Sequence, residues 1–526
     1  MNWSPLHNFT HYSTGLALSK PEDLIKKCVE YDYKSCAITD DCSLSGAISF
    51  HSYAKKAGIK PIIGTKMGDV ILLAKNKNGW KNLIKITSTK NLFNYNEDDS
   101  IIAIAKRSDY ESEFNLKLKY KDFYYMDEVF VQENPSMYTS KEHKELYSIL
   151  LSSNCKKPLT QISKWANEYK LLNDGTRFLP TPDMYNNCTN QEIVDKCENY
   201  DIIDGLNLPI FPFPSEYNSE YEYLVQLCRD GWRKKISGKV NNEQVYLDRV
   251  KKELSVVESA GLQGYFLIVQ DYINWAKNQG WLVGKSRGSS GGSLICYLLN
   301  ITEIDPIKYG LIFERFYNEG RNTKDNKELP DIDTDFPKFK RDEVIKYIEN
   351  KYGKDKVSHI VTYSELKGKS SIKTVLRAFN TCSNEEMNNI TKNIPSKEDI
   401  SDLLSDSGED SILMWTLKNE PDILKEWVTI DKDNILYGDL SNMFNMAIQL
   451  EGTFIGTGKH ASGIIISKNP LNECCPMMLD KNGETLVSLD MSDSKKAGFV
   501  KFDILAVAVL DKLMGINSLL RYGRII

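Results

Sequence analysis

Positions 330–336 read Pro-Asp-Ile-Asp-Thr-Asp-Phe, in which three aspartates alternate with apolar or neutral residues. Side chains on a β-strand point alternately to opposite faces, so Asp331, Asp333 and Asp335 share one face. Carboxylates crowded on one face repel each other, and this costs stability unless a cation neutralises them. Mg²⁺ prefers such hard oxygen ligands, with substrate phosphates and water completing its octahedron. The stretch predicts a strand with a metal site, whereas an isolated Asp-x-Asp would favour a solvated edge strand.

A second apolar segment supplies a further acid and a cation. Positions 499–505 read Phe-Val-Lys-Phe-Asp-Ile-Leu, and on a strand Lys501 and Asp503 lie on one face. Two cations about 3.5 to 4 Å apart could then activate a 3′-hydroxyl and stabilise a leaving pyrophosphate. Lys501 would serve as a phosphate partner. The two segments together predict nucleotidyl transfer.

A glycine- and serine-rich stretch lies between Trp281 and Asn300, where a strand end, a loop and an apolar helix are expected. Glycines let the backbone approach an anion, and serine hydroxyls can cap the helix or donate to phosphate oxygens. The stretch lacks the upstream glycine of a Walker A loop, so ATPase chemistry is a poor interpretation, and a flexible turn is the structural alternative. The residues concerned are Gly284, Gly288, Gly291, Gly292, Ser289, Ser290 and Ser293, with Lys285 and Arg287 adding positive charge.

Bulk composition narrows the class of protein. The 526 residues are too many for one hydrophobic core and favour roughly three or four domains. Hydrophobic residues make up 41% and charged residues 26%, with no apolar run long enough for a bilayer and no signal peptide, so a cytoplasmic protein is expected. The 11 cysteines form no Cys-x-x-Cys pair, which predicts reduced thiols. The net charge of -5 does not indicate nucleic acid, so any duplex contact needs a local basic face.

Three prolines between Leu208 and Pro214 predict a domain boundary, because they can continue neither a helix nor a central strand. Before it, apolar runs at 59–64 and 70–74 alternate with helical stretches such as 21–31, a pattern typical of a small α/β domain. After it, apolar spacing predicts helices over 220–235, 246–260 and 264–278.

The order and spacing of several segments resemble one family, the bacterial replicative DNA polymerase III alpha subunits, which are C-family DNA polymerases. The resemblance covers nearly the whole chain. The segments are 265–270 (Tyr-Phe-Leu-Ile-Val-Gln), 284–293, 301–306 (Ile-Thr-Glu-Ile-Asp-Pro), 313–316 (Phe-Glu-Arg-Phe), 330–336, 458–463 (Gly-Lys-His-Ala-Ser-Gly) and 500–503 (Val-Lys-Phe-Asp).

The resemblance implies a multidomain α/β fold. A PHP-like (polymerase and histidinol phosphatase) α/β domain would be followed by a polymerase-beta-like nucleotidyltransferase palm with an inserted helical thumb. The implied activity is template-directed DNA polymerisation, in which dNTPs are added to a primer 3′-hydroxyl on primer-template DNA with two Mg²⁺ ions. The expected boundaries are 1–212 for the PHP-like domain, 213–362 and 449–510 for the two palm parts, 363–448 for the thumb and 511–526 for the start of a truncated fingers region.

The resemblance also implies roles for single residues. Asp331, Asp333 and Asp503 would be the catalytic metal ligands, and Asp335 an auxiliary. The incoming triphosphate would meet Gly288, Ser289, Ser290, Ser293, Arg315 and Lys501. For Arg315 alone, a surface ion pair is the default interpretation.

The region that resembles the thumb carries a line of cations. Lys369, Lys373 and Arg377 recur at four-residue spacing, which places them on one helical face. Sequence-independent contacts to duplex phosphates fit this face, and a solvated helix surface is the alternative. His460 also matches a family motif, but a structural histidine explains it equally well, so it receives no chemical role.

The N-terminal segments 7–13, 37–41 and 55–64 resemble a PHP domain in which metal ligands are missing. Active PHP domains bind metals through histidines and carboxylates. Here other residues stand at those positions, and a lysine ammonium would repel a divalent cation. The resemblance therefore implies a structural PHP domain with a degraded metal site. The replacements are Phe9, Asp41, Lys66, Asp69 and Tyr185.

In the family, fingers, clamp-binding and OB domains follow the third catalytic aspartate, whereas this sequence ends at Ile526. Three interpretations stay open. The chain is an excised set of domains, the first half of a split polymerase, or a truncated phage-like copy. In the split case a second polypeptide would carry the fingers and reach a sliding clamp. Alternative functions are a catalytically weak remnant that binds DNA or a replication protein and, less favoured, a PHP phosphoesterase.

Overall fold

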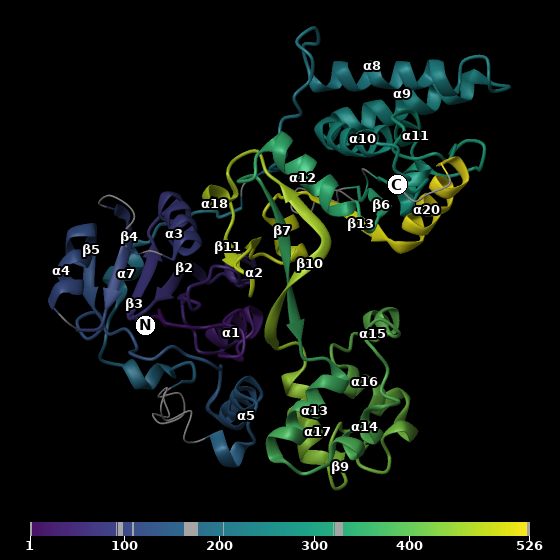
Figure 1. Cartoon of the computed structure of the whole chain (residues 1–526). Coiled ribbons are helices and arrows are strands. Elements are labelled where there is room, and N and C mark those ends of the chain that lie inside the picture. The colour runs from purple at the N-terminus through teal and green to yellow at the C-terminus, as the bar shows by residue number, and fades with distance from the viewer. Residues whose placement is uncertain are drawn as a thin grey trace. The chain divides into compact units, whose positions relative to one another are not determined.

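The computed structural model describes residues 3–90, 92, 98–107, 110–162, 177–203, 205–318, 320 and 330–522 (Figure 1). The chain divides into two compact units. The first unit comprises Met1–Ile202 with Thr362–Gly458, and the second unit comprises Ile203–Val361 with Lys459–Ile526. Helices and β-sheets combine along the chain, which confirms the predicted multidomain α/β fold class. The finer domain boundaries given above stay a prediction.

In the first unit, the N-terminal stretch forms a five-stranded sheet in the order β1-β2-β3-β4-β5. The outer pairs β1·β2 and β4·β5 are parallel, and the inner pairs are antiparallel. The apolar runs identified in the sequence become β2 and β3, and the helical stretch near residue 21 becomes α1. The elements are α1 (Pro21–Glu30), β1 (Ser35–Ile38), α2 (Ala47–Ala57), β2 (Lys60–Met67), β3 (Val70–Ala74), α3 (Lys77–Thr89), β4 (Asp98–Ala105), α4 (Tyr110–Lys119), β5 (Tyr120–Tyr125), η1 (Lys141–His143), α5 (Lys144–Cys155), η2 (Pro182–Tyr185) and α7 (Gln191–Lys196).

The second stretch of the first unit is mainly helical. Its apolar side chains form one core with Leu146 and Ile149 of α5. The elements are α13 (Gly368–Phe379), α14 (Asn384–Thr391), α15 (Ser401–Ser407), α16 (Ile412–Asn419), η6 (Pro421–Ile423), α17 (Ser441–Leu450) and a hairpin of β8 (Thr429–Ile430) with β9 (Leu436–Tyr437).

A six-stranded sheet in the order β11-β12-β7-β10-β13-β6 carries the acidic segments. Strand β13 (Lys501–Val507) runs antiparallel to β10 (Phe454–Ile466) and parallel to β6 (Asp333–Pro337). The boundary between the compact units falls within β7 (Val357–Glu365) and within β10. The remaining strands are β11 (Met477–Leu479) and β12 (Thr485–Val487).

The helices predicted after the proline-rich segment are confirmed as α8 (Glu220–Lys235), α9 (Glu243–Ser259) and α10 (Gln263–Asn278). Ser219 and Asn242 cap α8 and α9 by accepting backbone N–H groups. Apolar residues of these helices share one buried core with strands β6, β10 and β13. The other elements of this unit are η3 (Gly288–Gly292), α11 (Leu294–Leu298), η4 (Phe313–Arg315), α12 (Arg341–Tyr352), α18 (Leu471–Cys474), α19 (Met491–Lys496) and α20 (Ala508–Tyr522).

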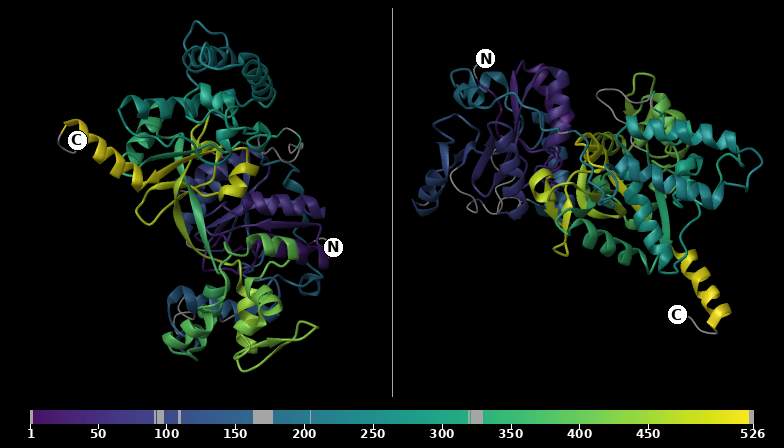
Figure 2. Two further views of the ribbon diagram at one scale, coloured as in Figure 1. Left: turned by 90° about the vertical axis from the view of Figure 1, so that its right-hand side faces the viewer. Right: turned by 90° about the horizontal axis from the view of Figure 1, so that it is seen from above.

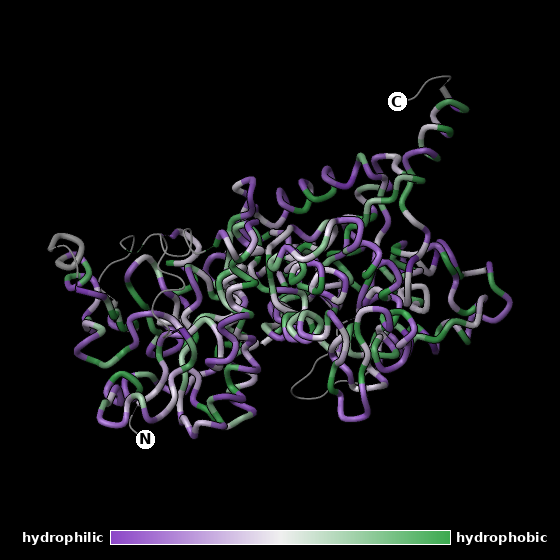
Figure 3. Tube along the Cα trace, turned by 90° about the horizontal axis from the view of Figure 1, so that it is seen from below, coloured by the Kyte–Doolittle hydropathy of each residue, from purple (hydrophilic) through white to green (hydrophobic). Residues whose placement is uncertain are grey.

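Helix α20 follows β13 and projects from its end (Figures 1 and 2). Figure 3 shows hydrophobic and hydrophilic residues alternating along it. Five of its large apolar side chains are exposed: Val509, Leu513, Ile516, Leu519 and Leu520. The helix thus presents an apolar surface that the described part of the chain leaves uncovered.

Candidate metal centre and nucleotide loop

The alternation that the sequence predicts is present over residues 331–336, although the strand itself, β6, begins only at Asp333. Ile332, Thr334 and Phe336 are buried, whereas Asp331 is exposed and Asp333 is partly exposed. Asp335 is also partly exposed, so all three carboxylates lie on the opposite face from the core. Burial of the alternate residues anchors the strand and directs the acids outward.

Pairing with β13 brings the third acid alongside. Asp503 lies directly opposite Asp333 in the parallel β6·β13 ladder, and opposite Gly463 in the antiparallel β10·β13 ladder. One carboxylate oxygen from each of Asp331, Asp333 and Asp503 lies within 4.8 Å of the others. Among the described residues, these three are the one group of His, Cys, Asp or Glu side chains with such spacing.

The electrostatics of this acidic cluster suit a cation. Asp503 is only 3% exposed, and burial raises its pKa above the usual range. Desolvation, followed by the charge of Asp331, likewise raises the pKa of Asp333. Both groups are therefore costly to ionise side by side unless positive charge is present. A divalent cation with oxygen ligands fits this set of donors.

Lys501 supplies part of that positive charge from the protein itself. Its Nζ lies 2.6 Å from Oδ2 of Asp503 and 4.0 Å from Oδ2 of Asp331. The ammonium is close to Asp503 Oδ2 without the alignment of a hydrogen bond. The predicted side-by-side placement of Lys501 and Asp503 is confirmed, and this cation lies against the carboxylates.

Two hydroxyl groups hold the acidic strands in register, and neither stands out in the sequence as a site residue. The Tyr265 hydroxyl accepts a hydrogen bond from the backbone N–H of Ile332 at 3.0 Å, between the first two acids. Thr334 Oγ1 donates to the carbonyl of Asp503 at 2.8 Å. The sequence offered one signal for Tyr265: it lies in the segment 265–270, one of the segments that resemble the family.

The glycine-rich loop lies against the acidic strand. The backbone N–H of Gly284 donates to the carbonyl of Asp335 at 2.9 Å, and a Cβ at Gly284 would lie 2.7 Å from the Asp335 Cβ. Gly288 has a positive φ of 59°, and a Cβ there would lie 3.6 Å from Asp333 Oδ2. Arg287 Nη1 lies 3.3 Å from Asp335 Oδ1. Both glycines therefore sit where a side chain would intrude or strain the backbone.

The strand end expected at Trp281–Gly284 is wrong, because residues 281–284 form no strand. The one backbone hydrogen bond described between residues 281–284 and β6 runs from the Gly284 N–H to the carbonyl of Asp335. Residues 281–284 contain a single glycine, Gly284, and one backbone hydrogen bond is too little to build a ladder.

The predicted nucleotide ligands differ in how available they are. Ser289 and Arg315 are exposed. The Ser290 hydroxyl donates to the carbonyl of Arg287 at 2.8 Å, and the buried Ser293 hydroxyl donates to Glu253 at 2.9 Å while capping α11. Two of the three serine hydroxyls thus already have partners inside the protein.

The thumb-like cations lie on helix α13, as the four-residue spacing predicts. Lys369 and Arg377 are exposed. The half-buried Lys373 donates to Asn388 Oδ1 at 2.7 Å, and Lys369 donates to the carbonyl of Lys392 at 3.3 Å. In the second unit, His460 Nδ1 accepts the N–H of Gly463 at 2.7 Å, which is a structural contact.

Several polar groups of the PHP-like region are buried, and some of them bond to other groups of the protein. His7 Nδ1 lies 2.9 Å from the carbonyl of Gln132, and desolvation lowers the pKa of His7 to about 3. Asp40 accepts hydrogen bonds from Thr10 and Ser13, and burial raises its pKa to about 6.

Some of the residues that replace the PHP ligands contact other parts of the protein, and none of them is placed to bind a metal. Phe9 is buried, Asp69 is exposed, and Tyr185 stacks on Trp3 with ring centroids 4.0 Å apart. Asp41 and Lys66 face each other in an isolated bridge. In the described part of this region no set of three ligands converges.

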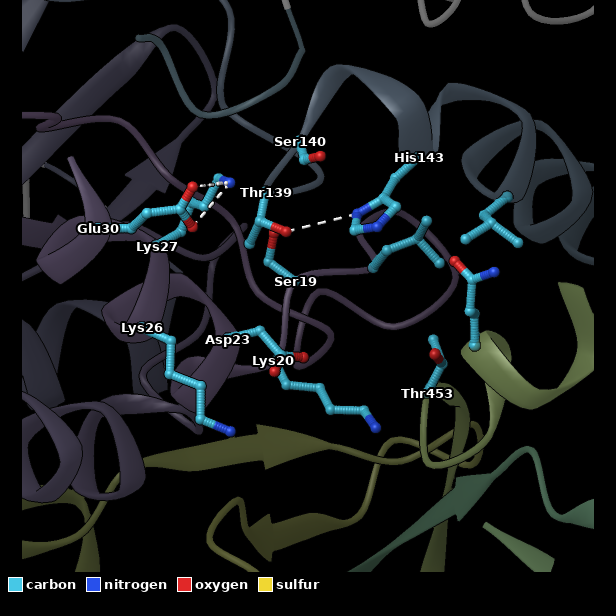
Figure 4. A pocket seen from close by; sticks show the side chains of 13 residues that line it. Ser19, Lys20, Asp23, Lys26, Lys27, Glu30, Thr139, Ser140, His143 and Thr453 are labelled. Atoms are coloured by element: carbon cyan, nitrogen blue, oxygen red, sulfur yellow. Dashed lines mark hydrogen bonds and ion pairs between the residues drawn. The ribbon is translucent and has the colours of Figure 1, made fainter. Parts of the chain in front are cut away.

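A separate pocket of about 440 Å³ lies in the first unit near α1, η1 and the residues that follow α17 (Figure 4). Some of the polar side chains that line it contact one another. Lys27 pairs with Glu30 at 2.8 Å, and Thr139 Oγ1 lies 3.4 Å from His143 Nδ1. None of the predicted site residues lines this pocket.

Two family models match the chain. The model described as "Bacterial DNA polymerase III alpha NTPase domain" matches residues 222–506, and the model described as "PHP domain" matches residues 5–150. The first match contains the acidic cluster, Lys501 and the glycine-rich loop.

Curated relatives named DNA polymerase III subunit alpha match nearly the whole chain. The protein from Borreliella burgdorferi is 32% identical over 98% of this chain and 49% of its own length. The Aquifex aeolicus protein is 28% identical over 98% of this chain and 52% of its own length, and the Ureaplasma parvum protein 31% over 95% and 50%. This chain therefore spans about half the length of the curated relatives it matches. No described helix has the length and apolarity to cross a membrane.

Proposed function

We propose that this chain, which belongs to the family of bacterial DNA polymerase III alpha subunits, carries the nucleotidyl-transfer centre of a template-directed DNA polymerase. The observation that carries the proposal is the cluster of Asp331, Asp333 and Asp503, whose oxygens lie within 4.8 Å of one another. These carboxylates would hold two Mg²⁺ ions, which when bound lower the pKa of a primer 3′-hydroxyl and stabilise the leaving pyrophosphate.

The chain's own residues would prepare the site for that chemistry. Asp503 is buried at the junction of two strand ladders, so its carboxylate has little freedom to move away. Lys501, 2.6 Å from Asp503, would keep positive charge beside the reacting phosphates. Asp335 is paired with Arg287 and would act as an auxiliary.

The dNTP would bind at the loop beside the acids. The backbone at Gly288 lies next to Asp333, and it and the exposed Ser289 hydroxyl would donate to phosphate oxygens, while Arg315 would add a charge-assisted contact. Ser290 would contribute through its backbone, since its hydroxyl has a partner already, and Ser293, whose N–H and hydroxyl both have partners, would hold the loop in place for the triphosphate. On α13, Lys369, Lys373 and Arg377 would contact the phosphates of primer-template DNA.

A polypeptide equivalent to the second half of the relatives would complete the enzyme. The support is twofold: the relatives are about twice as long as this chain, and α20 exposes an apolar surface. Such a polypeptide would supply the fingers. It would also bind a sliding clamp, so that this chain is connected to the clamp through it.

Primer extension by purified protein tests the proposal. We expect Mg²⁺-dependent addition of dNTPs, measured with the chain alone and with a polypeptide equivalent to the second half of a relative. Asp333→Asn and Asp503→Asn should each lower kcat by at least about a thousandfold, because several kcal/mol of transition-state stabilisation would be lost.

Asp342→Asn is the matched control, because this exposed aspartate pairs with Arg341 outside the acidic cluster. Its kcat should equal that of the unmodified protein. Extension that persists in Asp333→Asn would refute the assigned metal ligands. Salt-sensitive duplex binding without any incorporation, with or without the second polypeptide, would instead support a DNA-binding remnant.

A further inference from the structure

A buried carboxylate lies behind the nucleotide loop. Glu253 of α9 is fully buried, with 0% exposure. It accepts hydrogen bonds from Ser293 Oγ at 2.9 Å and from the backbone N–H groups of Leu294 and Ile295 at 3.0 Å each. Ser293, Leu294 and Ile295 are the residues at which the loop becomes α11. Glu253 therefore fastens the end of the loop to α9.

Arg249, one turn earlier on α9, extends this contact to both loop segments. Its Nε lies 2.6 Å from Glu253 Oε1. Its Nη2 donates to the carbonyl of Gly292 at 2.7 Å and to that of Leu311 at 3.3 Å. Leu311 precedes the turn that carries Arg315. Glu253 and Arg249 thus connect the glycine-rich loop with the turn that carries Arg315, a predicted contact of the triphosphate.

The contacts of Glu253 are those that an ionised carboxylate makes. Every polar neighbour described for it is a donor: one hydroxyl, two backbone N–H groups and a guanidinium. Burial raises the pKa of Glu253, and the backbone bonds and Arg249 lower it. A carboxylate that accepts from four donors is satisfied only without its proton.

The carboxylate also decides which loop atoms remain available to a ligand. The first amides of α11 are used by Glu253, so phosphate contacts would fall on the preceding residues near Gly288. Gly288 precedes this anchored end of the loop by five residues, and a Cβ there would lie 3.6 Å from Asp333 Oδ2. A shift of the loop would change the spacing between the triphosphate contacts and the acids.

We propose that Glu253 and Arg249 are positioning residues that hold the nucleotide loop and the Arg315 turn at a set distance from the acidic cluster. The inference rests on the proposed function, since it assigns that loop to the dNTP. In this scheme Glu253 touches no substrate because it is fully buried, and Arg249 acts through its bonds to Glu253 and to the carbonyls of Gly292 and Leu311.

Steady-state primer extension with Glu253→Gln and Arg249→Lys tests the proposal. Glutamine keeps the shape but offers one acceptor atom in place of two, so at least one backbone bond of the loop is lost. We expect the KM for dNTP to rise at least about fivefold in Glu253→Gln and less in Arg249→Lys, with primer-template affinity unchanged. A purely structural loss would instead lower the active fraction and leave KM as it was.

Asp248→Asn is the control, because Asp248 is an exposed acid on the same helix, bonded to Gln244. Hydrogen exchange of the amides at 288–295 provides a readout that does not need turnover. It should be faster in Glu253→Gln than in the unmodified protein and unchanged in Asp248→Asn. Unchanged exchange together with unchanged KM would overturn the inference while leaving the polymerase intact. If unmodified protein extends no primer, the proposed function fails, and the exchange rates alone decide whether Glu253 positions the loop.

Discussion

At the scale of single residues, the hydroxyl of Tyr265 is the least obvious support of the acidic cluster. It accepts the N–H of Ile332, which lies between Asp331 and Asp333. Tyr265→Phe removes this acceptor and leaves a buried amide unsatisfied, at a cost of about 1 to 3 kcal/mol. We expect kcat for primer extension to fall about tenfold or more, with unchanged affinity for primer-template, as measured by extension and binding assays.

The control for this prediction is Tyr352→Phe. The Tyr352 hydroxyl is buried in the same unit and has no hydrogen-bond partner in the described part of the chain, so its removal costs no bond. Its kcat should match that of the unmodified protein. Equal losses of kcat in the two variants would mean that removing any buried tyrosine hydroxyl lowers kcat. The hydrogen bond to Ile332 would then not be the cause.

At the scale of secondary-structure elements, the cationic face of α13 is where duplex binding can be measured. Lys369, Lys373 and Arg377 lie along one side of that helix, and two of them are exposed. Changing all three to Gln should weaken binding to primer-template DNA of any sequence. The slope of log K against log salt should become shallower by about 3 at most, measured by fluorescence anisotropy over a salt series.

Three exposed lysines of the N-terminal stretch serve as the charge-matched control for α13. They are Lys56, Lys81 and Lys141. Changing them to Gln removes the same net charge from other helices and should leave the salt slope unaltered. A similar loss of slope in both triple variants would show that net charge, and not the α13 face, governs binding.

At the scale of the whole molecule, Glu451 couples stability to pH. It is 7% exposed, accepts N–H groups from Ile412 and Leu413 at the start of α16, and burial raises its pKa to about 7 from 4.5. The folded chain therefore binds this proton more tightly than the unfolded chain. Its contribution to stability is largest below the unfolded pKa and declines as pH rises through the folded pKa.

Glu451→Gln removes this pH dependence. Relative to the variant, the unmodified protein should lose up to about 3 kcal/mol of stability between roughly pH 5 and pH 8. Calorimetric unfolding across that range measures the difference, and since the chain has two compact units, the effect should appear in one transition. Glu426→Gln, at an exposed glutamate of the same unit, should show no such drift. A constant difference between Glu451→Gln and the unmodified protein would contradict the assigned pKa.

Much of the acidic strand could be predicted because its signal is local. The alternation at 330–336 reports which side chains share a face, and the structure has Ile332 and Phe336 buried as expected. The positions of the helices after residue 219 could likewise be predicted from the spacing of apolar residues. The strand expected at 281–284 did not form, because among the described residues this segment makes one backbone hydrogen bond to β6, from Gly284 to Asp335.

The amino-acid sequence by itself determined the helices after residue 219, the apolar strands of the N-terminal stretch, the outward face of the acids and the family, because periodicity and motif order are properties of neighbouring residues. Only the tertiary structure decided that Asp503 lies opposite Asp333, that Tyr265 supports Ile332, and that Ser293 donates to Glu253. These partners stand 40 to 170 positions apart in the sequence. Their pairing follows from how buried strands and helices pack, and no local pattern encodes that packing.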